Sequence, residues 1–336
     1  MEIKTANACY VTDVHGNSYI DTTMGSGAQI IGHNNKLIKK ISQQIEKGTI
    51  YTIPNCHTRQ VNYYLKKYIN PDFYEQYIFC NSGTEANMRA IRLARAFTGK
   101  SLIGRFHGGW HGGLDGFLDE HPDNKGVPQE TNKLFKVLPY NDEQCFNMIT
   151  EDMAAVIIEP VQGSNPRSDV KEFLQRLRQK CTVLGGGFPI GALGGKEQIM
   201  KTKGVFYGGT FSANPLSMYA ASLILEAIIE SKQIDYDKLQ QAGEFFRNEI
   251  NSFFISEGKK MRAIGCGPLS RIVFTDQFIK NRKERDYFET KNAQEDFTAK
   301  LKKIGVFVNG NGLYHFSMSH SPEVIKVLIS KIKEAC

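Results

Sequence analysis

The chain has 336 residues, 41% of them hydrophobic, which is enough for a large core and predicts two domains. Its 42 Lys and Arg against 35 Asp and Glu leave a dispersed net charge of +7, and no basic block interleaved with aromatic residues indicates nucleic-acid binding. Neither a signal-peptide core nor a membrane-spanning apolar run is present. The seven cysteines include no Cys-x-x-Cys pair, a pattern typical of reduced cytosolic thiols. We therefore expect a cytoplasmic protein with no nucleic-acid and no membrane partner.

The N-terminal residues predict a hairpin followed by two helices. Residues 10–14 and 18–21 have strand character and flank a Gly-Asn turn. A short amphipathic helix carries Leu37 to Ile45 and stops at Gly48, and a second helix is expected over 58–68.

The middle of the chain predicts alternating strands and helices. The expected strands are 77–80, 101–106, 134–138 and 154–158, and the expected helices are 84–98, 142–150 and 168–180. Such alternation is typical of an α/β fold, in which a mostly parallel sheet is covered by helices on both faces.

The character of the sequence changes after Asn214-Pro215. Helices are expected at 216–230, 236–256, 290–303 and 322–334, and strands at 271–275, 306–308 and 314–317. This pattern predicts a smaller α+β domain. We expect an N-terminal hairpin and helix segment at 1–50, a large domain at 51–212 and the small domain at 213–336.

The stretch Asn81–Ala86 predicts an anion-binding site. It follows an apolar strand and opens a helix. The apolar face of this helix is formed by Ala86, Ala90, Ile91, Ala94 and Phe97. Three arginines, Arg89, Arg92 and Arg95, lie off that face. A strand, a short Gly/Ser/Thr turn and a helix N-terminus aim amide N–H groups and hydroxyls at one point, where the helix dipole favours an anion. A capped turn that binds nothing is the alternative.

Four further motifs follow in order, at Phe106–Gly112, Ile157–Gly163, Gly185–Gly195 and Gly208–Pro215. With the turn at 81–86 they resemble the class III (subgroup II) aminotransferases, which depend on pyridoxal 5′-phosphate (PLP). The chain is most similar to the glutamate-1-semialdehyde 2,1-aminomutase branch, from about Tyr10 to the C-terminal helix. The resemblance implies the fold type I architecture of PLP-dependent transferases and a small-molecule amino donor and acceptor.

The resemblance also implies roles for single residues. Ser82, Gly83 and Thr84 would hold the PLP phosphate. Trp110 stands at the position of the aromatic residue that stacks on the ring, with His111 beside it.

Two more residues come from later motifs. Glu159 stands where the family holds a carboxylate at the carboxyl end of a strand, the usual ligand crevice of an open α/β sheet. Thr210 matches a residue that reaches the phosphate from the neighbouring subunit, which implies a homodimer with shared sites.

Other interpretations of these residues remain open. Trp110 could belong to the core, and Glu159 before a proline could cap a strand. His107 and His111 are four residues apart but have glycines around them and no third ligand, so we expect no metal. Gly185–Pro189 lacks the spaced glycines and the following helix of a dinucleotide-binding loop.

The chain departs from the family between its last large-domain helix and the glycine-rich motif. About 40 residues, enough for two strands, are missing at 182/183, and Thr182 occupies the position of the lysine that binds PLP covalently. The aspartate that pairs with the pyridine nitrogen also has no counterpart. Lys180 and Lys196 are better explained as solvated surface lysines than as substitutes. We therefore expect an incomplete central sheet and no covalent attachment of PLP. We assign no catalytic residue.

A second departure is Gly25-Ser26, where the aminomutase branch has a Ser-Trp pair. Two hypotheses follow. The chain is a class III aminotransferase or aminomutase that moves an amino group between a small amino compound and an oxo acid, aldehyde or keto-sugar. Alternatively, it is an inactive relative that binds PLP or pyridoxamine phosphate (PMP) non-covalently or serves as a partner subunit. A nucleotide-binding protein is a remote third interpretation.

Overall fold

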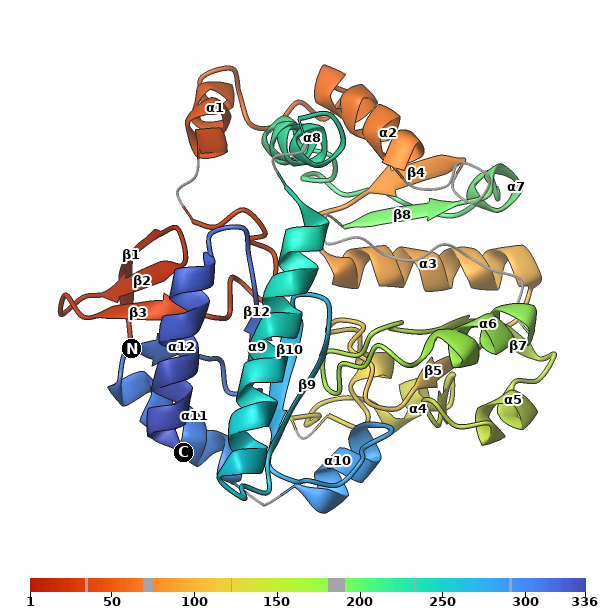
Figure 1. Cartoon of the computed structure of the whole chain (residues 1–336). Helices are drawn as coiled ribbons and strands as arrows, with labels where there is room; N and C mark the ends of the chain where they lie inside the picture. The colour runs from red at the N-terminus through yellow and green to blue at the C-terminus, as the bar shows by residue number, and fades with distance from the viewer. Residues whose placement is uncertain (34–35, 69–74, 122, 181–190, 232–233, 290–291) are drawn as a thin grey trace. The chain divides into compact units, whose positions relative to one another are not determined.

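The computed structural model describes the whole chain except residues 34–35, 69–74, 122, 181–190, 232–233 and 290–291 (Figure 1). It divides into two compact units. Unit 1 comprises Met1–Ile38, Val161–Val170 and Ile234–Cys336, and unit 2 comprises Lys39–Pro160 and Lys171–Gln233. Unit 1 thus joins the N-terminal residues to the C-terminal third of the chain. The three segments expected at 1–50, 51–212 and 213–336 stay a prediction.

Unit 1 contains a four-stranded sheet in the order β1-β2-β3-β11, formed by Ile3–Asn7, Tyr10–Asp13, Ser18–Asp21 and Val306–Phe307. The predicted hairpin is confirmed, because β2 and β3 pair antiparallel with Tyr10 opposite Ile20. The short strand β11 adds to β3 in parallel, with Val306 opposite Ile20. Two ends of the sequence therefore meet in one sheet.

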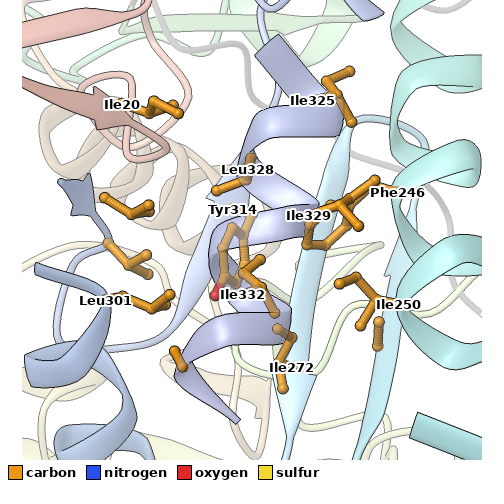
Figure 2. Packing of buried hydrophobic residues seen from close by; sticks show 14 of the residues in the cluster. Ile20, Phe246, Ile250, Ile272, Leu301, Tyr314, Ile325, Leu328, Ile329 and Ile332 are labelled. Atoms are coloured by element: carbon orange, nitrogen blue, oxygen red, sulfur yellow. The ribbon is translucent and has the colours of Figure 1, made fainter. Parts of the chain in front are cut away.

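The second sheet of unit 1 is antiparallel, in the order β12-β10-β9, formed by Leu313–His315, Leu269–Val273 and Arg262–Cys266. The helices of this unit are α9 (Tyr236–Ser256), α10 (Arg282–Phe288), α11 (Ala293–Lys303) and α12 (Pro322–Ala335). Figure 2 shows their core, to which α9 contributes Phe246 and Ile250, α12 contributes Ile329 and β12 contributes Tyr314, all fully or almost fully buried. The predicted α+β character of this region is confirmed.

His320 is a buried polar side chain in unit 1. The Ser317 amide donates to its Nδ1 at 3.1 Å, so Nδ1 carries no proton. The Nε2–H group donates to the Asp21 carbonyl oxygen at 3.1 Å. Burial lowers the pKa of His320 to about 4, although the hydrogen bond to Asp21 raises it slightly. The neutral ring therefore links the loop before α12 to the end of β3.

Because the unfolded histidine has a pKa of 6.5, acid favours the unfolded state here. The stabilisation of the fold by the neutral His320 side chain is complete above pH 6.5 and is lost as the pH falls toward 4. We expect the wild type to lose roughly 2 kcal/mol more unfolding free energy than His320→Gln between pH 8 and pH 5. Urea unfolding at both pH values measures this difference. Equal losses of unfolding free energy in the two proteins would contradict the lowered pKa of buried His320.

Unit 2 contains the helices and strands of the middle of the chain. Its helices are most of α1 (Lys36–Ile45), α2 (Cys56–Tyr68), α3 (Gly83–Thr98), α4 (Gln129–Asn132), α5 (Gln144–Met148), α6 (Lys171–Lys180), α7 (Glu197–Met200) and α8 (Pro215–Ile229), with a 3₁₀ turn at Asp115–Phe117. Its strands are β4 (Gln76–Phe79), β5 (Leu102–Phe106), β6 (Phe135–Leu138), β7 (Met153–Ile157) and β8 (Ala192–Gly195).

The strands of unit 2 form two pieces of sheet. The order β6-β5-β7 is parallel throughout, which confirms the predicted parallel arrangement. Strands β4 and β8 pair antiparallel, with Phe79 opposite Ala192. Within the described ranges no strand pairing joins the two pieces, whereas α3 packs against both β7 and β8. The expected deletion at 182/183 lies outside the described residues, so the incomplete sheet stays a prediction.

Helix α3 corrects part of the predicted apolar face. Ala86, Ile91 and Ala94 are buried as expected, but Phe97 is 47% exposed near the end of the helix. Arg89, which the sequence placed off that face, is only 2% exposed. A charged side chain can be buried in this way only when it has partners, and Arg89 has four of them.

None of the helices in the described part of the chain is both long and apolar enough to cross a membrane.

Candidate functional site

The first turn of α3 offers two unpaired amides at the positive end of a 16-residue helix. Ser82 is the N-cap, and its Oγ accepts from the Glu85 amide at 3.2 Å. The Glu85 carboxylate reaches back and accepts from the Asn81 amide at 3.1 Å, which completes a capping box. Among the described residues, no group accepts a hydrogen bond from the amides of Gly83 and Thr84. These amides remain available to an anion.

The loop after β5 is attached to this turn. The Gly113 amide donates to Thr84 Oγ1 at 3.2 Å, and Asn87 Nδ2 donates to the His111 carbonyl at 2.9 Å. Gly112 has a φ of +93°, and a Cβ there would lie 2.2 Å from Thr84 Oγ1. Only glycine therefore allows the loop to approach Thr84 so closely.

The same loop places Trp110 beside Glu159. Trp110 follows β5 and Glu159 follows β7, and these parallel strands end at the same edge. The Trp110 amide donates to Glu159 Oε2 at 2.9 Å. The indole itself is 63% exposed, although a large aromatic side chain is normally buried. The arrangement leaves a flat apolar face available to a ring.

His111 is directed into the protein, unlike its neighbour. It is 5% exposed, and its ring centroid lies 5.3 Å from that of Phe117. Burial and, to a smaller extent, the nearby charge of Arg105 lower the pKa of His111 to about 4. Arg105 itself pairs with Asp119 and, at 3.1 Å, with Glu120. His111 is thus a neutral residue beneath the loop at physiological pH.

Gly191 brings a distant segment against the N-cap of α3. Its carbonyl accepts from the Cys80 amide and from the Cys80 thiol, with Sγ at 2.6 Å. A Cβ at Gly191 would lie 2.4 Å from the Ser82 carbonyl oxygen. Gly191, the residue before β8, therefore lies directly beside the turn that carries Ser82 and Gly83.

Thr210 is not brought to this turn within the chain. It is exposed in the segment between α7 and α8, and no hydrogen bond among the described residues involves it. The structure thus joins the turn of Ser82, Gly83 and Thr84, which follows β4, to the loop after β5 through side-chain hydrogen bonds. It places Trp110 of that loop beside Glu159 at the end of β7, buries His111, and leaves Thr210 on the surface.

Comparison with known proteins identifies the family. The model of the class-III aminotransferases matches residues 1–183. A glutamate-1-semialdehyde 2,1-aminomutase from Methanobrevibacter smithii is 31% identical over 365 residues, covering 91% of this chain and 84% of the relative. The chain belongs to the class-III aminotransferase family. This family depends on PLP.

One further relative and two solved structures are also similar to the chain, and the two structures show its fold. The glutamate-1-semialdehyde 2,1-aminomutase of Methanocaldococcus jannaschii is 28% identical, covering 99% of this chain and 90% of the relative. An omega-transaminase from Sphaerobacter thermophilus has a TM-score of 0.87 at 23% identity, covering 99% of this chain and 90% of that one. A glutamate-1-semialdehyde-aminomutase from Pseudomonas aeruginosa has a TM-score of 0.84 at 16% identity, covering 100% of this chain and 87% of that one. The fold is that of fold type I PLP-dependent transferases.

The described residues of this class-III chain fit a phosphorylated pyridine. The two unpaired amides and the Ser82 and Thr84 hydroxyls suit a phosphate, and Gly83 has open space around its missing Cβ. Exposed Trp110 suits an aromatic ring. In the described part of the chain, no group of three His, Cys, Asp or Glu is placed to hold a metal ion.

Neither lysine considered as a substitute is shown at this site. Lys196 follows β8, whose last residue Gly195 lies opposite Gln76 at the start of β4. Ser82 lies beyond the other end of β4, whose four residues span roughly 13 Å. The side chain of Lys180 lies outside the described residues.

Sequence reasoning assigned no role in the site to three residues that build it, namely Asn87, Arg89 and Gly191. A signal existed for Arg89, since it lies three residues after buried Ala86 and four before buried Leu93, on the inner face of a helix. Gly191 belongs to the motif Gly185–Gly195, but its contact with Cys80, 111 residues away, has no local signal. The same holds for Asn87, whose partner is 24 residues away.

Proposed function

We propose that this chain is a class-III aminotransferase-like or aminomutase-like protein that binds PLP or PMP at the start of α3. The observation that carries the proposal is the pair of unpaired amides at Gly83 and Thr84, next to the loop that exposes Trp110. The phosphate would accept from these amides and meet the hydroxyls of Ser82 and Thr84. Because the helix dipole favours negative charge there, the site suits a dianion.

Trp110 and Glu159 would position the ring. The indole offers the stacking face, and the Glu159 carboxylate fixes the Trp110 backbone through the 2.9 Å hydrogen bond. His111 would support the loop from below as a neutral residue. When bound, the coenzyme supplies an electron sink, and the chain's own residues bind and orient it.

The substrates we propose are a small amino compound and an oxo acid, aldehyde or keto-sugar. The relatives from M. smithii and M. jannaschii are aminomutases. Gly25-Ser26 replaces the Ser-Trp pair of that branch, which favours an aminotransferase-type substrate.

We further propose that the coenzyme is held without a covalent bond, so that this chain turns over slowly or not at all. The alignment with the M. smithii enzyme is longer than the chain, so the relative has residues with no counterpart here. The family match also stops at residue 183, next to the junction inferred at 182/183. A lysine-to-alanine variant of the P. aeruginosa aminomutase forms a complex with PMP, which supports non-covalent binding as a realistic alternative.

Fluorescence tests this proposal site-specifically, because Trp110 is the single tryptophan of the chain. We expect PLP and PMP to quench its emission saturably and dialysis to restore it. Borohydride treatment followed by peptide mass spectrometry should find no lysine carrying the coenzyme. A lysine adduct would overturn the non-covalent proposal, and the absence of quenching would overturn coenzyme binding altogether.

We propose a homodimer with shared sites. Thr210 is exposed between Phe206 and Phe211, whose side chains are 72% and 58% exposed. Exposed aromatic side chains are typical of association surfaces. Sedimentation velocity should give twice the 37.8 kDa mass of the chain, and a monomer would contradict the shared site.

A further inference from the structure

The segment Phe206–Ser212 has no helix or strand of its own, so its shape depends on contacts elsewhere. Two arginines of α3 provide them. Arg92 Nη1 donates to the Phe206 carbonyl at 2.9 Å. Arg89 Nη2 donates to the Gly208 carbonyl at 3.2 Å and to Ser212 Oγ at 2.9 Å.

Arg89 differs from Arg92 because it is buried. Its Nη1 donates to the Phe79 carbonyl at the end of β4 at 3.0 Å, and its Nη2 lies 3.5 Å from Glu85 Oε2. A buried guanidinium needs such partners, and its planar fork can serve several acceptors at once. One side chain thus joins the strand before the N-cap turn, the helix and the surface segment.

Thr210 lies between the two points that Arg89 holds. The Ser212 amide donates to the Gly209 carbonyl at 2.9 Å and closes a turn around Thr210. A Cβ at Gly209 would lie 2.9 Å from Arg89 Nη2, so the turn rests directly on the guanidinium. The result is an outward-facing Thr210 on a segment with fixed ends.

We propose that Arg89 is a positioning residue for Thr210, acting across the dimer. By holding Gly208 and Ser212 it orders Thr210 for contact with the coenzyme phosphate in the partner's site. This inference rests on the proposed function, in which Ser82–Thr84 of one subunit and Thr210 of the other share one phosphate.

The first test is a double-mutant cycle read by quenching of Trp110. We expect Arg89→Met and Thr210→Ala each to weaken PLP binding about tenfold, and the double variant to bind no more weakly than either single one. Arg89→Lys keeps the positive charge but not the planar guanidinium, so its loss of PLP affinity should be smaller than that of Arg89→Met. Additive losses would show that Arg89 acts independently of Thr210 and would overturn the proposal.

Mixed dimers test the action across subunits. One subunit carries Arg89→Met and the other carries Gly83→Asp, which places a carboxylate in the anion site. The intact turn of the first then faces the intact Thr210 segment of the second. We expect one PLP per dimer to bind with wild-type affinity, although both parent homodimers bind weakly.

The outcomes of this experiment separate the two proposals. A mixed dimer without a tight site would mean that Arg89 acts in its own subunit, which overturns the inference while wild-type binding stands. A wild type that does not bind PLP overturns the proposed function as well. If Arg89→Met does not fold, Arg89→Lys replaces it in the same mixed dimer, with its smaller loss expected to be rescued in full.

Discussion

We expect Gly83→Asp to weaken PLP binding at least about a hundredfold without harming the fold. Gly83 is the first residue of α3, and its amide is one of the two unpaired donors. A carboxylate there would lie close to a phosphate dianion, and like charges about 5 Å apart near a protein surface repel by roughly 3 kcal/mol per pair. The same carboxylate favours the helix, because its N-terminus carries a partial positive charge.

The matched control is Gly83→Ala. No atom lies within 4 Å of the Cβ it would add, and the amide stays in place. Fluorescence titration of Trp110 with PLP measures both variants, and thermal unfolding verifies their folding. If both variants bound like the wild type, the phosphate would not be held by this turn.

Gly191→Ala should cost about 3 kcal/mol of unfolding free energy and weaken PLP binding in addition. The new Cβ would lie 2.4 Å from the Ser82 carbonyl oxygen and 2.7 Å from the Ser82 nitrogen. Both are backbone atoms, so the overlap is relieved only by moving β8 away from β4 or by displacing the N-cap of α3.

Gly113→Ala is the control for this substitution, because no atom lies within 4 Å of its Cβ. Urea unfolding at pH 8 compares the two variants, and we expect a change below about 1 kcal/mol for the control. Equal, small effects would show that Gly191 does not approach the Ser82 turn as closely as the structure indicates.

The helices with strong local signals were predictable from the sequence. The expectation of 84–98 became α3 at Gly83–Thr98, and that of 236–256 became α9 with the same bounds. Each has a capping residue and an apolar stripe that specify it locally. Parallel pairing of β5, β6 and β7 followed from their alternation with helices.

The elements that sequence analysis missed depend on distant partners. Strand β8 reads Ala-Leu-Gly-Gly and has no alternating pattern, yet it becomes a strand because Leu193 pairs with Ile78. Strand β9 and the pairing of β11 with β3 are likewise set by neighbours far along the chain. Tertiary pairing overrides weak local preference in such segments.

The sequence motifs of the candidate site could be recognised in advance, but the buried residues that support them could not. Trp110 and Glu159 follow β5 and β7, so their proximity could be anticipated from the parallel sheet. Ser82–Thr84 follow β4, which pairs antiparallel with β8 in the other piece of sheet. The inward direction of His111 and the burial of Arg89 could not be anticipated, because they depend on Phe117 and on the segment at 208–212.

The pairing of β11 with β3 has a consequence for biosynthesis. A ribosome releases Ser18–Asp21 long before Val306 is translated, so β3 waits for a partner that emerges 286 residues later. Unit 2 is completed by residue 233 and can compact in the meantime. Vectorial synthesis would therefore leave one edge of the nascent N-terminal hairpin without its partner strand until translation is nearly finished.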